Sequence, residues 1–152
     1  MANPKSTAQI AGHPLHPMLV PFPIAFLVGT LVTDLVYAAT ADAFWATASY
    51  WLLVAALVMA ALAAVMGFID FFGDSRIRAG STAWLHMGGN LVAVLLSLVN
   101  FWLRLGSPTA GHAVGLWISL VVVLLLLFNG WMGWELVYKH RVGVSDEATL
   151  SR

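Results

Sequence analysis

Six ionisable side chains lie at the ends of long apolar stretches, and all six fall toward the same side of the molecule. A histidine can ligate a metal ion or haem iron, and a carboxylate can ligate a metal or orient an imidazole. Ionisable groups at membrane depth are costly and usually serve a function. The six residues are His13, His16, Asp70, His86, Glu135 and His140.

The composition defines the environment in which these side chains must act. Of the 152 residues, 61% are hydrophobic and 9% are charged, and the mean hydropathy is +0.87. A soluble domain is about 25% charged, so this is a membrane protein. The net charge is zero without a basic block, which argues against a nucleic-acid partner. The absence of cysteine excludes disulfides and thiolate ligands.

Four stretches are long enough to cross a bilayer, since a helix needs about 20 apolar residues to do so. They run from about 17 to 39, 44 to 72, 84 to 103 and 114 to 138. The connections are short, so consecutive helices should pack antiparallel. We therefore expect one all-α domain, an up-down four-helix membrane bundle, without an internal repeat. Residues 1–12 lack the pattern of a cleaved signal peptide, so the first helix should remain.

The basic residues set the expected orientation, because cytoplasmic loops are enriched in lysine and arginine. Only Arg104 falls on the side opposite the termini. We expect a multi-pass protein of the bacterial inner membrane with both termini in the cytoplasm. The residues on the side of the termini are Lys5, Arg76, Arg78, Lys139, Arg141 and Arg152.

The third helix carries a polar face along its whole length. Its polar residues lie within about 40° of one line at 100° per residue, and they should face the bundle because lipid offers no hydrogen bonds. Arg104 ends this face on the side where Asp34 lies in the first helix, so we expect a structural Asp34–Arg104 ion pair with Asn100 nearby. The polar residues are His86, Asn90, Ser97, Asn100 and Arg104.

The first helix begins with a proline-rich segment, Gly12-His13-Pro14-Leu15-His16-Pro17, followed by Pro21 and Pro23. Prolines inside a helix free carbonyl groups and bend the chain. We expect a bent or re-entrant start that holds His13 and His16 near the membrane interface. The second helix has a stripe of small residues that suits close packing, and Asp70 continues that stripe toward the neighbouring helices.

These motifs resemble a bacterial membrane family catalogued as domain of unknown function 2231, and the resemblance covers nearly the whole chain. The resemblance implies a small four-span protein without an agreed activity. Some members carry Rieske iron–sulfur or cytochrome c-like domains, which implies an electron-transfer context that is weaker here because this chain has none. The shared motifs include the opening segment, Phe22-Pro23-Ile24, Asp34-Leu35, Gly67-x-x-Asp70, His86-x-x-x-Asn90, Gly133-Trp134-Glu135-Leu136-Val137-Tyr138 and Val142-Gly143-Val144.

The first hypothesis for the cluster is a redox module that holds a cofactor. His86 is the best ligand because it lies on an inward helix face, and its partner for haem b would be His16, His140 or Glu135. Alternatively, His13, His16, His86 and Glu135 supply ligands for iron or zinc. In either case Asp70 and Asn90 would orient an imidazole.

Two further hypotheses need no cofactor. In one, the cluster is a buried hydrogen-bond network of a structural or assembly subunit of a larger membrane complex. Besides the lipid bilayer, the expected partners of the chain are a redox protein or a second copy of itself. In the other, the polar face of the third helix relays protons or ions. Hydrolytic motifs such as Gly-x-Ser-x-Gly and His-Glu-x-x-His are missing, so we do not expect an enzyme of that kind.

Overall fold

The computed structural model describes residues 2–145, and four long helices dominate this part of the chain. The first span consists of α1 (Leu15–Leu19) and α2 (Pro21–Thr40), and the second is α3 (Ala43–Gly73). A short helix, α4 (Ser75–Arg78), leads to the third span, α5 (Ser81–Leu103). The fourth span is α6 (His112–Trp134), which ends in a π-helical turn, η1 (Glu135–Lys139). The all-α membrane bundle is thus confirmed, and all four spans extend slightly beyond the predicted ranges.

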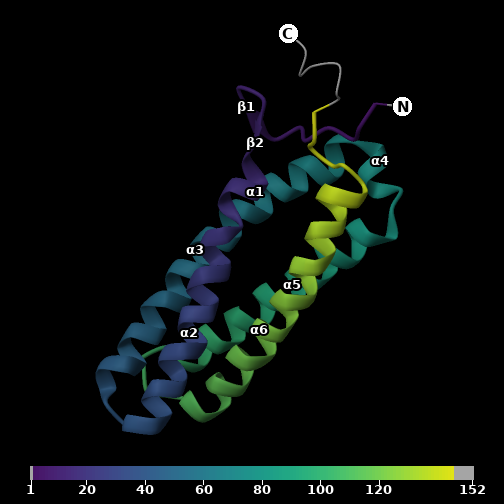
Figure 1. Cartoon of the computed structure of the whole chain (residues 1–152). Helices are drawn as coiled ribbons and strands as arrows, with labels where there is room; N and C mark the ends of the chain where they lie inside the picture. Colours follow the sequence, from purple (N-terminus) through teal and green to yellow (C-terminus); the bar gives the residue numbers. More distant parts are fainter. Residues whose placement is uncertain (1, 146–152) are drawn as a thin grey trace.

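The four spans run alternately up and down, so that both ends of the described chain lie at one end of the bundle (Figure 1). We call this the terminal end, and the end with the 41–42 and 104–111 connections the opposite end. Each consecutive pair packs closely, α2 against α3 and α5 against α6. The two pairs join where α2 meets α6 and where α3 meets α5.

At the start of the first span, where we expected a bend, α1 and α2 are separated at Val20, whose backbone angles remain helical. Pro21 and Pro23 lack the N–H groups that would continue the hydrogen bonding of α1, so the ladder is interrupted there. Before α1, the chain makes a small hairpin of β1 (Gln9–Ile10) and β2 (His13–Pro14). Its turn uses left-handed backbone at Ala11 and Gly12, with φ of 50° and 81°.

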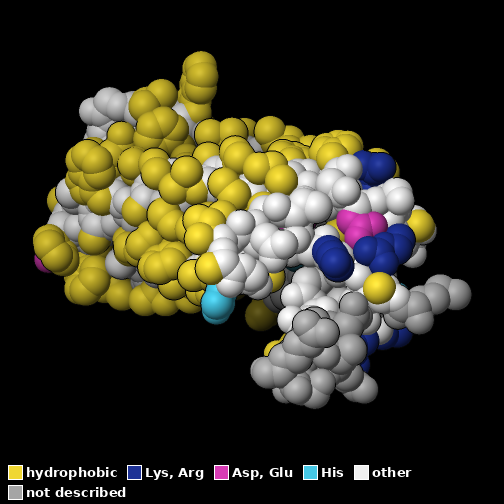
Figure 2. Space-filling model, turned by 90° about the horizontal axis from the view of Figure 1, so that it is seen from above, with side chains coloured by type: hydrophobic (Ala, Val, Ile, Leu, Met, Phe, Trp, Pro, Cys, Tyr) yellow, Lys and Arg dark blue, Asp and Glu magenta, His cyan; other side chains and the backbone are white. Residues whose placement is uncertain are grey.

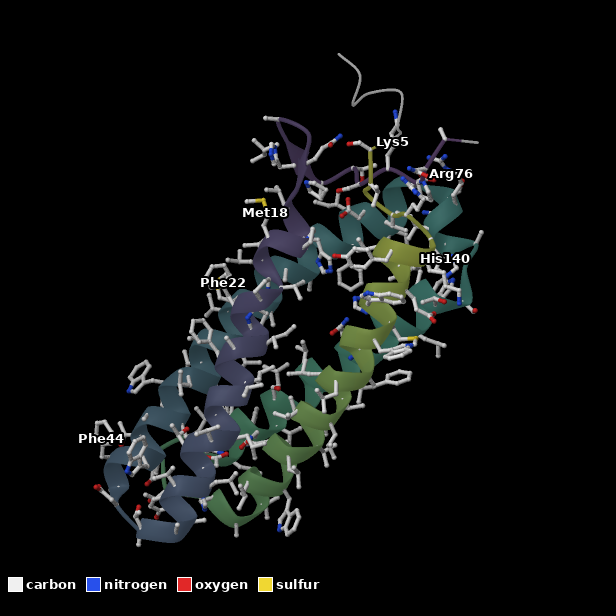
Figure 3. The ribbon with its side chains drawn as sticks, in the orientation of Figure 1. Lys5, Met18, Phe22, Phe44, Arg76 and His140 are labelled. Carbon is white, nitrogen blue, oxygen red and sulfur yellow. The ribbon has the colours of Figure 1, made fainter. Side chains whose placement is uncertain are left out.

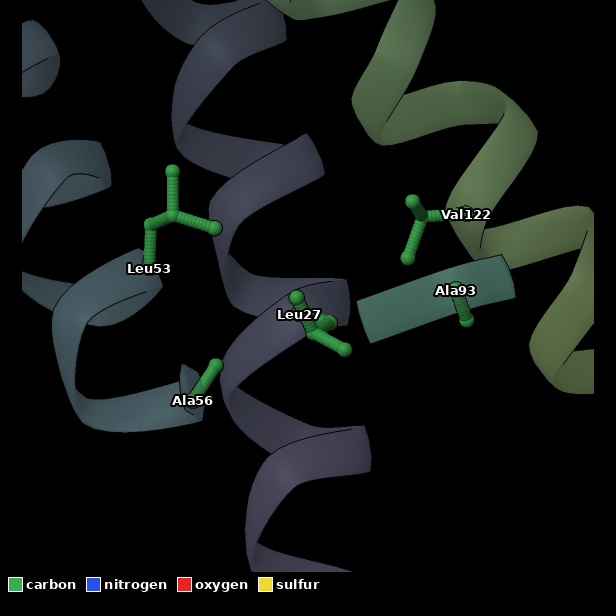
Figure 4. Packing of buried hydrophobic residues seen from close by; sticks show 5 residues of the cluster. All are labelled: Leu27, Leu53, Ala56, Ala93 and Val122. Carbon is green, nitrogen blue, oxygen red and sulfur yellow. The ribbon is translucent and has the colours of Figure 1, made fainter. Parts of the chain in front are cut away.

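The centre of the bundle is filled by residues from all four spans, as Figure 4 shows. Outward-facing side chains such as Met18 and Phe22 are half exposed and point away from the bundle (Figure 3). Seen from the terminal end, a broad hydrophobic surface lies beside a group of Lys and Arg side chains around an acidic one (Figure 2). The bundle is therefore apolar along its length and charged at the terminal end. The central cluster contains Leu27, Leu53, Ala56, Ala93 and Val122.

Candidate functional site

His16 lies in α1 with its imidazole against α3. Its Nδ1 is 2.8 Å from the carbonyl oxygen of Ala63. A carbonyl can only accept, so Nδ1 carries a hydrogen, and in the neutral form of the ring the lone pair is on Nε2. A Cβ on Gly67 would lie 2.9 Å from Cε1 of this ring, so only glycine leaves room for it there. The close approach of α1 and α3 thus fixes both the position and the tautomer of His16.

His86 lies in α5 with its imidazole against α6. Its Nδ1 is 3.0 Å from the carbonyl oxygen of Asn129, so this nitrogen also carries the hydrogen. Its Nε2 lies 3.1 Å from Asn90 Nδ2, which donates to the lone pair. A Cβ on Gly133 would lie 3.2 Å from Cε1 of the ring. The hydrogen-bond partners of His86 thus match the tautomer with the hydrogen on Nδ1 and the lone pair on Nε2.

The Asn129 side chain adds an unusual feature beside His86. Asn129 is 2% exposed, and its Oδ1 is buried without a hydrogen-bond partner in the described part of the chain. This oxygen lies against Gly89, where a Cβ would be 2.2 Å away. Gly88 next to it faces open space, since a Cβ there would meet nothing within 4 Å. The Gly88-Gly89 pair thus combines a tight contact with α6 and unfilled space on its other side.

The two imidazoles come together between the halves of the bundle. Their ring centroids are 6.4 Å apart and their planes are nearly perpendicular, at 89°. Metal–imidazole bonds are about 2.0 Å long, and two rings that ligate one metal from opposite sides have their centroids about 6 Å apart. The centroid spacing of His16 and His86 therefore matches that of a ligand pair, while Nε2 of His86 is engaged by Asn90.

The other predicted ligands lie apart from this pair. His13 is exposed in β2, and its Nδ1 contacts the carbonyl of Ala11. Glu135 lies in η1 and contacts Lys139 at 3.4 Å, and the backbone N–H of the exposed His140 donates to the Glu135 carbonyl. Within residues 2–145, no group of three or more His, Asp or Glu side chains is arranged to hold a metal ion. The metal site expected from His13, His16, His86 and Glu135 is therefore not formed in the described residues.

Asp70 has a different environment from the one expected. Its Oδ1 accepts hydrogen bonds from Ser6 Oγ at 2.8 Å and from the backbone N–H groups of Thr7 and Ala8, each at 2.7 Å. Asp70 therefore anchors the N-terminal segment across the end of α3, instead of orienting an imidazole in these contacts. Asn90, by contrast, does contact the ring of His86.

A second carboxylate strengthens the same anchor. Asp74 Oδ2 accepts the backbone N–H of Lys5 at 3.0 Å, and the Arg76 side chain donates to both oxygens of Asp74. The Arg76 guanidinium holds the pKa of the Asp74 carboxyl well below its usual value. We call residues 2–8, bound by Asp70 and Asp74, the N-terminal strap.

A second polar cluster lies deep in the bundle toward the opposite end. The predicted pair is present: Arg104 Nη1 and Nη2 donate to Asp34 Oδ1 and Oδ2, each at 2.8 Å, and both side chains are fully buried. The expected neighbour Asn100 accepts from Arg104 Nε at 2.9 Å. This bidentate geometry is the strong form of an Arg–carboxylate pair.

The deep cluster also contains residues that the sequence analysis missed. Ser49 Oγ and Ser119 Oγ donate to the two oxygens of Asp34 at 2.5 Å and 2.8 Å. Gly115 leaves the space for Arg104, since a Cβ there would lie 2.8 Å from Nη2. Single serines within apolar spans are the sequence signal that points to such partners. We call Asp34, Ser49, Asn100, Arg104 and Ser119 the deep polar network.

Comparison with known proteins gives a family but no activity. The family model described as "Predicted membrane protein (DUF2231)" matches residues 12–146 of the chain. No curated protein and no solved structure matches the chain.

Proposed function

We propose that this chain, which belongs to the DUF2231 family of predicted membrane proteins, is a small redox component that binds haem b through His16 and His86. The observation that carries the proposal is the hydrogen bonding that the imidazoles of His16 and His86 have in common. Each gives its Nδ1 hydrogen to a backbone carbonyl, as metal-ligating histidines almost always do. The Nε2 atoms would ligate the iron, once Asn90 gives up its hydrogen bond to Nε2 of His86.

The number of ligands favours haem over a non-haem ion. Structural zinc takes four protein ligands and catalytic zinc takes three, whereas haem iron needs only one or two axial ligands from the protein. The described chain brings together two histidines and no third ligand. When bound, the haem would supply one-electron redox chemistry, exchanging electrons with a redox protein partner.

The chain's own residues would perform three tasks at this site. The carbonyl groups of Ala63 and Asn129 orient the two rings. Asn90 occupies the Nε2 lone pair of His86 and would move aside when the ligand binds. The surrounding apolar helices exclude water, and a low-dielectric, water-poor site strongly affects a redox potential.

The test is the absorption spectrum of the full chain, produced in haem-replete cells, purified in mild detergent, and recorded oxidised and dithionite-reduced. We expect a Soret band that sharpens and shifts on reduction. We expect His16→Ala and His86→Ala to lose it, and His13→Ala and His140→Ala to keep it. Size-exclusion profiles and thermal midpoints show whether each variant is folded. A flat wild-type spectrum, or a Soret band retained by folded His86→Ala, contradicts the proposal.

A second candidate is a structural or assembly subunit, and the Asn90–His86 contact favours it. With Asn90 donating to Nε2, both ring nitrogens of His86 are satisfied without a cofactor. This function predicts a flat spectrum together with co-purification of a membrane partner. It also predicts that Asn90→Leu releases that partner, whereas the redox function predicts retention of the haem spectrum in this variant.

A further inference from the structure

The two halves of the bundle place equivalent residues at equivalent positions. We call Leu15–Gly73 the first hairpin and Ser81–Lys139 the second. In their first helices, buried residues correspond at a constant offset of 70 positions, and the two histidines share this offset. The corresponding pairs are His16 and His86, Pro23 and Ala93, Leu27 and Ser97, Thr30 and Asn100, and Asp34 and Arg104.

The second helices correspond in the same way at an offset of 66 positions. The matched positions of the two helices are thus four residues closer in the second hairpin, about one helical turn, although its connection, 104–111, is longer than the 41–42 connection of the first. The pairs are Ser49 and Gly115, Leu53 and Ser119, Ala56 and Val122, Ala63 and Asn129, and Gly67 and Gly133. All are buried except the two glycines, which lie against the imidazoles.

The two histidines also make their hydrogen bonds to corresponding residues of the two hairpins. His16 bonds the carbonyl of Ala63 and lies over Gly67, four residues later. His86 bonds the carbonyl of Asn129 and lies over Gly133, again four residues later. In an α-helix the side chain at i+4 lies over the carbonyl of residue i, so a glycine there exposes the carbonyl to the ring. Both hairpins use this same arrangement.

Equivalent residues also contact each other, which locates a two-fold pseudo-axis. In a two-fold arrangement, only residues next to the axis meet their own equivalents. His16 meets His86 toward the terminal end, and Asp34 meets Arg104 deep in the bundle. The pseudo-axis therefore passes between both pairs and runs along the bundle, across the membrane. The α2–α6 and α3–α5 contacts are the two equivalent interfaces that it relates.

We propose that the haem lies on this pseudo-axis, with one hairpin supplying each axial ligand in the same way. This inference rests on the proposed function. An axis that exchanges the two axial ligands is perpendicular to the line joining them, so it lies in the porphyrin plane. A haem held in this way would have its plane along the pseudo-axis, upright in the bilayer, with one face toward His16 and the other toward His86.

The first experiment compares matched variants of the two hairpins in the full-length protein. We expect His16→Met and His86→Met to give the same spectral species and to shift the midpoint potential in the same direction. In Gly67→Ala the added methyl group displaces the ring of His16, and in Gly133→Ala it displaces the ring of His86. We expect both variants to weaken haem binding alike, by about ten-fold. Gly88→Ala is the control, because a Cβ there meets nothing within 4 Å.

The second experiment measures the haem plane by electron paramagnetic resonance on oriented membranes of the oxidised protein. We expect the largest g-value axis, which is normal to the haem, to lie in the membrane plane. A haem retained by only one of the Met variants, or a haem parallel to the membrane, overturns this inference but not haem binding. A haem-free wild-type protein overturns both.

Discussion

Asp34 and Arg104 have no exposed surface, so neither side chain can replace its partner with water. A buried pair of this kind need not add much stability over apolar residues, because burying two charges is costly. Removing one partner is a different matter, since it leaves the other charge buried and unpaired. The deep polar network thus makes the bundle sensitive to single changes at these two positions.

We expect Arg104→Ala to lower the free energy of unfolding by about 3–5 kcal/mol, measured by denaturant titration in detergent. Arg76→Ala removes an exposed arginine from an ion pair and should cost about 1 kcal/mol or less. Asp34→Ala combined with Arg104→Ala should cost less than the sum of the two single variants. Additive costs would show that the pair is not coupled.

The sequence predicted the site residues that lie in a regular α-helix, where each residue turns by 100°. The inward face of α5 placed His86, Asn90, Asn100 and Arg104 correctly, because a 100° repeat describes that helix throughout. Glu135, expected as a ligand partner of His86, contacts Lys139 in η1 instead. The carbonyl acceptors of Ala63 and Asn129 could not be predicted, since every residue has a carbonyl.

At the scale of the elements, helix packing depends on glycines that face polar side chains. Gly115 in α6 lies against the side chains of Asn100 and Arg104 from α5, with hypothetical Cβ distances of 2.7 Å and 2.8 Å. Gly130 in the same helix faces open space. The two glycines therefore differ in what a methyl group would meet, although both lie in the same membrane span.

We expect Gly115→Ala to destabilise the bundle by about 1–3 kcal/mol, because the added methyl displaces the guanidinium of Arg104. Gly130→Ala should be neutral or slightly stabilising, since alanine favours helix over glycine by about 1 kcal/mol. Thermal midpoints of the two variants in the same detergent check this difference. Equal midpoints would mean that α6 can move away from α5 without cost.

The N-terminal strap gives a second prediction at this scale. Asp70→Ala removes the acceptor of three hydrogen bonds, so the strap should detach from α3 and α4. We expect trypsin to cleave after Lys5 at least several-fold faster than in the wild type, as followed by intact mass. Asp42→Ala is the control, because it removes a cap bond to Phe44 at the opposite end. An unchanged cleavage rate would show that other contacts hold the strap.

For the whole molecule, the number and order of the spans were predictable, because hydropathy determines both. The correspondence inferred between the two hairpins was not predictable. Most equivalent positions carry different side chains, such as Asp34 and Arg104 or Ala56 and Val122. They correspond in burial and contacts, which a single sequence does not display. Pairing opposite charges on the pseudo-axis in fact requires the two hairpins to differ there.

The basic residues predict the orientation of the whole molecule. In the described chain, Lys5, Arg76, Arg78, Lys139 and Arg141 lie at the terminal end, while Arg152 falls outside the described residues. We expect a C-terminal green fluorescent protein fusion to fluoresce and a C-terminal alkaline phosphatase fusion to be inactive. Fusions placed in the 104–111 connection should give the reverse. An active C-terminal phosphatase would mean that the termini are outside.

The unequal lengths of the helices have a consequence for the bilayer itself. With 31 residues, α3 is about 46 Å long, whereas α5 with 23 residues is about 35 Å long. A hydrocarbon core is about 30 Å thick, so α3 must tilt or extend into the headgroup layer. The strap is hydrogen-bonded to the end of α3 and continues into the β1–β2 hairpin. In this hairpin Ile10 is 65% exposed. We therefore expect this hairpin to lie in the headgroup layer, at a depth that depends on the thickness of the bilayer.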